Sequence, residues 1–114
     1  MTDCVFCRII SGQIPSTTVY EDSDIVAFRD LEPHAPLHVL IVPRRHIPTV
    51  NDLGPEDDAL VGAMLRAAAR IARDHGYDVR GYRTVFNCNG EAGQSVYHLH
   101  LHLLAGRGMH WPPG

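Results

Sequence analysis

The chain of 114 residues contains no lysine, so all ten of its basic residues are arginines. The absence of lysine excludes enzymes that use a lysine amine as their nucleophile. The formal net charge is −3, and the basic stripe that nucleic-acid binders need is missing. No apolar run approaches the roughly 18 residues that a membrane-spanning helix requires. We therefore expect neither nucleic acid nor a membrane among the partners.

Cysteine is also scarce, with three residues, and the N-terminus carries no apolar stretch typical of a secretory signal peptide. Thiols are kept reduced in the cytoplasm, and we expect a cytoplasmic protein with reduced cysteines. The length fits a single domain over residues 1–114, and a hydrophobic content of 45% is enough for a small core.

Histidine and leucine alternate in a run near the C-terminus, from Tyr97 to Leu104. Alternation with period two predicts a β-strand with one buried face, because successive side chains point to opposite faces. Three leucines would then enter a core: Leu99, Leu101 and Leu103. Three histidines would share the opposite face, which a helix would not allow: His98, His100 and His102. Either this is a solvated strand face that is rich in histidine, or the chemistry of its imidazoles is used.

Imidazole ligates metals, transfers protons near neutral pH and attacks electrophiles through its unprotonated nitrogen. Three rings at alternate positions of a straight strand diverge too far to share one ion, so at least one is expected to be available for chemistry. A polar loop with two glycines, at residues 90–95, precedes the histidines and offers main-chain N–H groups to an anion. An anion site beside a nucleophilic base indicates attack at phosphorus.

The segment from Gly93 to Leu104 resembles the His-φ-His-φ-His-φ-φ motif of the histidine triad (HIT) superfamily, in which φ is apolar. The tail at residues 109–114 is similar to the ending of its Hint branch, the purine nucleoside phosphoramidases, and residues 4–10, 26–31 and 36–46 match as well. The resemblance covers essentially the whole chain and implies one HIT domain over residues 1–114. It implies an α+β fold with about five antiparallel strands, one long helix and a short N-terminal helix. It also implies a homodimer whose sheets join into one ten-stranded sheet.

Local patterns predict the same elements. We expect a short helical turn at residues 4–10 and strands at residues 17–20, 24–29, 37–42 and 82–87. From Pro55 to Gly76, apolar residues recur at intervals of three and four, with acidic residues first and arginines last. This pattern predicts a helix of about 20 residues that can cover a sheet. In the resembled family this helix also builds the dimer interface.

Cys4 and Cys7 form a Cys-x-x-Cys pair, which can be a redox dithiol, half of a zinc site or a chance pair of buried thiols. A redox pair of the thioredoxin kind should follow a strand and open a long helix, which this segment does not. A zinc site needs two further ligands, for which His46 and His98 are candidates. The resemblance implies these four residues as a closed structural zinc site, with a cysteine pair, a histidine after the third strand and the first motif histidine.

The resemblance also implies roles for single residues. His100, the middle histidine of the motif, would be the nucleophile. His38 would lie behind the triad and join its hydrogen-bond network in a supporting role. His102 and Ser95 would contact the phosphate and the leaving group, and Asp30 would accept hydrogen bonds from the ribose hydroxyls. The other expected nucleotide contacts are the base pocket, a donor near the sugar, the glycine loop and the tail: Val5, Phe6, Ile9, Phe28, Leu31, Asn87, Gly93, Gln94 and Trp111.

The implied reaction is hydrolysis of the P–N bond of purine nucleoside 5′-phosphoramidates through a nucleotidyl-histidine intermediate, with no cofactor needed at phosphorus. One alternative is a dinucleoside polyphosphate hydrolase of the same superfamily, and another is a nucleotide-binding regulatory module with incidental turnover. A purely structural zinc protein would leave His100, His102 and Ser95 without a purpose. From the residues alone, Asp30 and Asn87 are equally consistent with turn residues.

Overall fold

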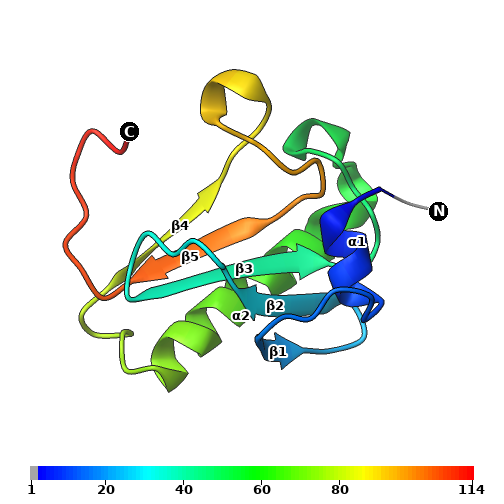
Figure 1. Cartoon of the computed structure of the whole chain (residues 1–114). Helices are drawn as coiled ribbons and strands as arrows, with labels where there is room; N and C mark the ends of the chain where they lie inside the picture. The colour runs from blue at the N-terminus through cyan, green and yellow to red at the C-terminus, as the bar shows by residue number, and fades with distance from the viewer. Residues whose placement is uncertain (1–2) are drawn as a thin grey trace.

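The structure is a computed structural model, and it describes residues 3–114. Within this part of the chain, five antiparallel strands form one sheet in the order β1-β2-β3-β5-β4 (Figure 1). The strands are β1 (Thr18–Glu21), β2 (Ile25–Arg29), β3 (Leu37–Pro43), β4 (Tyr82–Phe86) and β5 (Leu101–Ala105). The helical elements of the same residues are α1 (Val5–Ile10), α2 (Asp58–Asp74) and three 3-10 turns: η1 (Val50–Asp52), η2 (Pro55–Asp57) and η3 (Gly90–Ala92). The predicted α+β fold is confirmed.

Helix α2 covers one face of the sheet (Figure 1). The core between them contains residues of the helix that recur at intervals of three and four: Met64, Ala67, Ala68, Ile71 and Ala72. It also contains the three leucines of the alternating run, each at most 1% exposed: Leu99, Leu101 and Leu103. The prediction that these leucines enter a core is confirmed. None of the helices in the described chain is long and apolar enough to cross a membrane.

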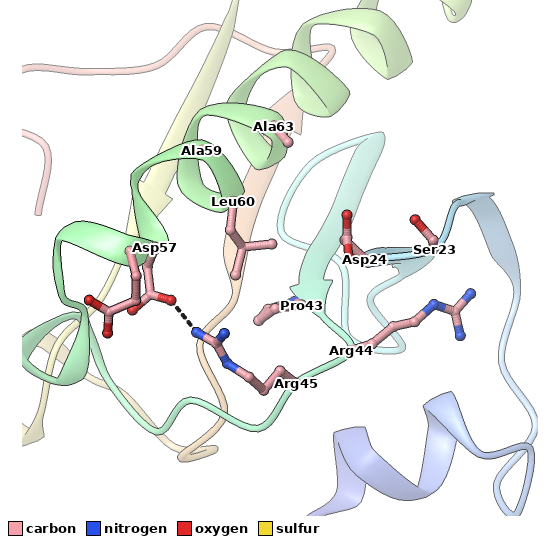
Figure 2. Close-up of a pocket in the computed structure, with 10 residues that line it drawn as sticks. Ser23, Asp24, Pro43, Arg44, Arg45, Asp57, Ala59, Leu60 and Ala63 are labelled. Atoms are coloured by element: carbon pink, nitrogen blue, oxygen red, sulfur yellow. Dashed lines mark hydrogen bonds and ion pairs between the residues drawn. The ribbon is translucent and has the colours of Figure 1, made fainter.

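The predicted helix of about 20 residues is divided in the structure, because its first turn is the 3-10 turn η2 and only Asp58–Asp74 is α-helical. The side chain of Asp57 stabilises this turn. Its carboxylate accepts a hydrogen bond from the main-chain N–H of Gly54 at 2.9 Å. It also forms an ion pair with Arg45 of the segment after β3, as Figure 2 shows.

The opposite face of the sheet carries a smaller apolar cluster beneath α1. Phe6 of α1 packs there against side chains of β2 and β3: Val26, Phe28, Leu40 and Val42. The rings of Phe6 and Phe28 meet edge to face, with centroids 5.4 Å apart. A helix of six residues is not stable on its own. The position of α1 therefore depends on this packing and on the groups that hold its N-terminal end.

Strand β5 begins at Leu101, later than the alternating run from Tyr97 predicts. The neighbouring strand β3 ends at Pro43, which has no N–H to continue the ladder. Beyond that point the N–H of Leu99 donates to the main-chain oxygen of Ile47 at 2.6 Å. The alternation of sides continues through this irregular segment, and the rings of His98 and His100 both contact Phe6.

Candidate active site

The histidine motif borders a cavity of about 340 Å³ on the face of the sheet that carries α1. Its walls come from α1, the loop between β2 and β3, β3 itself, the end of β4, the glycine loop and the motif. The predicted site residues that line it are Phe6, Asp30, His38, Asn87, Gly93, Ser95, His100 and His102. The fold therefore brings together side chains that are up to about a hundred positions apart in the sequence.

A smaller cavity of about 160 Å³ adjoins the first, since Phe6, Asp30 and Leu40 line both. Its walls are mostly apolar and include every residue that was predicted for the base pocket: Val5, Phe6, Ile9, Phe28 and Leu31. Leu31 is 89% exposed, so its side chain stands at the rim. A ligand with a flat apolar part in this cavity would direct its polar part towards Asp30 and the histidines.

The proposed nucleophile, His100, has a ring whose orientation is set by the main chain. Its Nδ1 lies 2.7 Å from the carbonyl oxygen of His98. A carbonyl only accepts, so Nδ1 carries the proton and Nε2 keeps the lone pair for an incoming ligand. Burial lowers the pKa of His100, which keeps the ring neutral at pH 7. The ring also meets the edge of Phe6, with centroids 5.0 Å apart.

His102 forms a second hydrogen-bonded group with His38 and Asp30. The distance from His38 Nε2 to His102 Nδ1 is 3.0 Å, and that from His38 Nε2 to Asp30 Oδ2 is 3.4 Å. Burial, followed by the neighbouring rings of His100 and His38, lowers the pKa of His102 to about 4. Burial also lowers the pKa of His38. Both rings are therefore neutral at pH 7.

The glycine loop, which is the expected anion cradle, uses part of its main-chain donors within its own turn. The main-chain N–H of Gly93 donates to Gly90 at 3.0 Å, and that of Gln94 donates to Asn89 at 3.1 Å. These two donors are engaged within the loop itself. Gly93 and Ser95 both line the cavity, and the contact of this loop with a phosphate stays a prediction. Gly93 has φ +86°, a conformation that favours glycine, and it closes the turn.

Two predicted nucleotide contacts do not line either cavity. The side chain of Gln94 is 7% exposed and braces the loop, because its Nε2 donates to Pro48 at 2.9 Å and its Oε1 accepts from Asn89 at 2.8 Å. Trp111 is 83% exposed. Its tail leaves the sheet at the end opposite α1 (Figure 1). Contacts from Trp111 and from the main chain of Gln94 to a nucleotide stay predictions.

Several lining residues were missed by the sequence analysis. Glu32, His34, Leu40 and Val96 line the larger cavity, and residues 14–16 line the smaller one. The available signal was the position of the loop at residues 32–36, which lies between the predicted site residues Asp30 and His38. Which of its side chains faces the cavity depends on the path of the loop, and the sequence pattern does not define that path.

Beside the cavity, four side chains converge with the chemistry of a zinc site: Cys4, Cys7, His46 and His98. Their ligand atoms all lie within 4.8 Å of one another. In tetrahedral zinc with bonds of about 2.3 Å to sulfur and about 2.0–2.1 Å to nitrogen, adjacent S and N atoms are about 3.5 Å apart, and two N atoms about 3.3 Å apart. The S–N distances that involve Nδ1 of His98 or His46 are 3.4, 3.4 and 3.5 Å, and the N–N distance is 3.2 Å. The donor set therefore fits a tetrahedral zinc ion.

The ring of His98 is oriented for this purpose. Its Nε2 donates to the main-chain oxygen of Pro43 at 2.8 Å, so the lone pair is on Nδ1, the atom that faces the cysteines. His98 is fully buried. Its side chain thus belongs to the metal cluster, and its carbonyl oxygen orients His100.

A further concavity, of about 420 Å³, lies at the N-terminal end of α2 (Figure 2). Its lining consists mainly of charged and small side chains, without histidine or cysteine among the described residues: Ser23, Asp24, Pro43, Arg44, Arg45, Glu56, Asp57, Ala59, Leu60 and Ala63. Asp57 neutralises Arg45 across its mouth. The histidines able to attack phosphorus line the cavity of about 340 Å³ described above.

Comparison with known proteins gives consistent matches. Residues 3–110 match the family described as scavenger mRNA decapping enzyme C-term binding. The chain is 48% identical to a purine nucleoside phosphoramidase of Escherichia coli (strain K12) over 105 residues, 92% of this chain and 88% of that protein. It superposes on a HIT family hydrolase from Legionella pneumophila Philadelphia 1 with a TM-score of 0.96 and 52% identity, over 98% of this chain and 100% of that one. For a histidine triad protein from Clostridium difficile, the TM-score is 0.92 at 42% identity, over 96% and 95% of the two chains.

Proposed function

We propose, since the chain belongs to the histidine triad (HIT) family and is a hydrolase, that it cleaves the P–N bond of purine nucleoside 5′-phosphoramidates. The observation that carries this proposal is the position of His100. Its Nε2 lone pair is available in the larger cavity, which adjoins the apolar one, because its Nδ1–H is held by the carbonyl of His98 at 2.7 Å. The similarity to the purine nucleoside phosphoramidase of Escherichia coli supports the same substrate class.

The nucleotide would bind across the two cavities. The purine would occupy the apolar cavity against Phe6 and Phe28, where burial of a flat ring is favourable. Asp30, between the two cavities, would accept hydrogen bonds from the ribose hydroxyls. The phosphoryl group would then lie beside His100, with His102 and Asn87 as hydrogen-bond donors to its oxygens.

The reaction would proceed in two displacements at phosphorus. In the first, Nε2 of His100 bonds to the α-phosphorus while the P–N bond of the substrate breaks, and the leaving nitrogen takes a proton from solvent water and departs as an amine. Ser95 would hydrogen-bond this leaving group. In the second, water attacks the same phosphorus and gives up a proton to the solvent, the bond to His100 breaks, and the nucleoside monophosphate is released with the ring restored.

Zinc would be held by Cys4, Cys7, His46 and His98 and would supply a structural cross-link when bound. These residues tie the N-terminal end of α1 to the segment after β3 and to the motif. Because Phe6 of α1 lines both cavities, the cross-link would keep the wall of the base pocket in place. No step of the proposed reaction uses the metal.

The proposed assembly is a homodimer. Strand β4 is at the edge of the sheet, and its unpaired main-chain groups are free to pair with a second copy. Tyr82 of β4 is 39% exposed, and Leu65 of α2 is 44% exposed. A ten-stranded sheet would cover both side chains. It would also bring Trp111 of one copy within reach of the nucleotide cavity of the other copy.

The test is release of AMP from adenosine 5′-phosphoramidate by the purified chain, followed by chromatography, with His100→Ala as the control. We expect steady release by the wild type and none above the uncatalysed rate by the variant. A diadenosine polyphosphate is assayed in parallel. Faster cleavage of that substrate would favour the dinucleoside polyphosphate hydrolase, and no turnover of either substrate with tight AMP binding would favour a regulatory module.

A further inference from the structure

We propose that Arg107 is a positioning residue that acts on His102 through the main chain of His34 and the ring of His38. The inference rests on the proposed function, in which His102 donates an N–H to the phosphoryl group. It concerns which of the two ring nitrogens of His102 carries the proton, a property that the histidine motif does not determine by itself.

The direction of the hydrogen bonds follows from one main-chain group. The N–H of His34 lies 3.0 Å from Nδ1 of His38. A main-chain N–H only donates, so Nδ1 of His38 has to accept and must be unprotonated. The ring is buried and neutral, and its single proton is therefore on Nε2.

The same reasoning shows which ring nitrogen of His102 carries the proton. The Nε2–H of His38 faces two acceptors, His102 Nδ1 at 3.0 Å and Asp30 Oδ2 at 3.4 Å. The shorter contact indicates donation to His102. Nδ1 of His102 then holds a lone pair, and its proton is on Nε2. His102 lines the cavity, so this N–H is the donor that a phosphoryl oxygen would meet.

The cluster of Asp30, His38 and His102 has a second interpretation, since its ligand atoms lie within 4.8 Å of one another and could hold a metal ion. A metal on His38 would need the lone pair of Nε2. A neutral imidazole has only one unprotonated nitrogen, and the N–H of His34 already occupies it. The geometry thus favours proton placement over metal binding at this cluster.

Arg107 holds the loop that supplies this N–H. Its Nε donates to the main-chain oxygen of His34 at 2.8 Å, and its Nη1 donates to Gly108 at 3.1 Å. The residue before it, Gly106, has φ +100°, and a Cβ there would lie 2.8 Å from Cβ of Pro36. The turn after β5 is therefore in close contact with the loop at residues 32–36. Arg107 fixes the oxygen of His34, while the N–H of the same residue sets the tautomer of His38.

The tautomers can be read directly by long-range ¹H–¹⁵N correlation of zinc-loaded, ¹⁵N-histidine-labelled protein without substrate. In the wild type we expect the Nε2–H form for His38 and His102 and the Nδ1–H form for His100. An Nδ1–H form of His102, or an Nε2 of His38 that is unprotonated, would overturn the proposal. This readout needs no turnover. A protein with the expected tautomers that releases no AMP would refute the proposed function and leave the positioning role standing.

Arg107→Met removes the clamp at an exposed position and should leave the fold intact. We expect His102 to become a mixture of tautomers while His100 is unchanged, and kcat to fall by about threefold to tenfold at constant KM, as for one lost hydrogen bond. The matched control is Arg44→Met, because Nε of Arg44 also donates to a main-chain oxygen, that of Asp22 at 2.8 Å, and Arg44 does not line the histidine cavity. Its tautomers and kcat should match the wild type. The proposal fails if Arg107→Met behaves like the wild type, or if both variants lose kcat equally.

Discussion

The Nδ1–H of His100 donates to the main-chain oxygen of His98 across 2.7 Å. The side chain of His98 turns its own Nδ1 towards Cys4, at 3.4 Å from the sulfur, while its Nε2 donates to Pro43. One residue thus connects the metal cluster with the proposed nucleophile. The lone pair of His100 is directed by covalent geometry and a single main-chain hydrogen bond.

The pH dependence of turnover follows from the burial of the rings. Burial lowers the pKa of His38, His100 and His102, to about 4 for His102, from the usual value near 6.5. A histidine with a lowered pKa stays neutral at pH values where a free imidazole is protonated. We predict that kcat/KM for AMP release is constant from pH 7 to below pH 6.5 and declines only at more acidic pH. Initial rates in overlapping buffers, corrected with His100→Ala for non-enzymatic breakdown, test this, and half-maximal activity at or above pH 6.5 would contradict it.

Loss of one cysteine ligand should remove zinc. We predict about one zinc per chain in the wild type, and substantially less in Cys4→Ser, by metal analysis after gel filtration. The melting temperature of this variant should fall by about 5–10 °C, because metal binding contributes to folding free energy. Cys88→Ser is the control, since Cys88 is not part of the cluster, and it should keep its zinc. Full zinc content in Cys4→Ser would disprove the proposed ligand set.

Asp30 is expected to recognise the ribose. Charge-assisted hydrogen bonds are worth about 1.5–3 kcal/mol, so Asp30→Asn should raise KM for adenosine 5′-phosphoramidate by about tenfold or more. The 2′,3′-dideoxy analogue lacks the hydroxyls, and its KM should change by less than about twofold. Glu32→Gln is the control carboxylate, because Glu32 lines the same cavity. An equal rise in KM for both substrates would contradict ribose recognition and would indicate that Asp30 acts on His38 instead.

The proposed dimer depends on the exposed face of α2. Light scattering after gel filtration should give the mass of two chains for the wild type. Leu65→Glu should shift the protein to one chain, because a charge would be buried at the interface. Val79→Glu is the matched control, as Val79 is 93% exposed and lies in the connection between α2 and β4. A monomeric wild type, or a dimeric Leu65→Glu, would be inconsistent with this assembly.

Local periodicity predicted most of the fold. The alternation around Leu101 and the three- and four-residue spacing around Met64 are properties of single segments, and both residues lie in the core. The start of β5 was not predictable in this way. It depends on Pro43, which ends the neighbouring strand and is more than fifty positions away in the sequence.

The site was predicted less completely, and mainly through the family resemblance. The resemblance indicated most of the residues that line the two cavities, and it placed His38 in the network of the triad, where it contacts His102, 64 positions away. It did not indicate His34, because the contribution of this residue is a main-chain N–H, which no side-chain pattern encodes. The glycine-rich sequence likewise did not show that the N–H of Gly93 donates to Gly90 within the loop.

The covalent intermediate is the most direct test of the central claim. The wild type is mixed with excess adenosine 5′-phosphoramidate, quenched in alkali within milliseconds to seconds, digested and analysed by tandem mass spectrometry. We predict an AMP adduct on His100, formed as fast as turnover requires and absent from the His100→Ala variant. Turnover without any adduct on His100, or AMP release by His100→Ala at the wild-type rate, would contradict the mechanism.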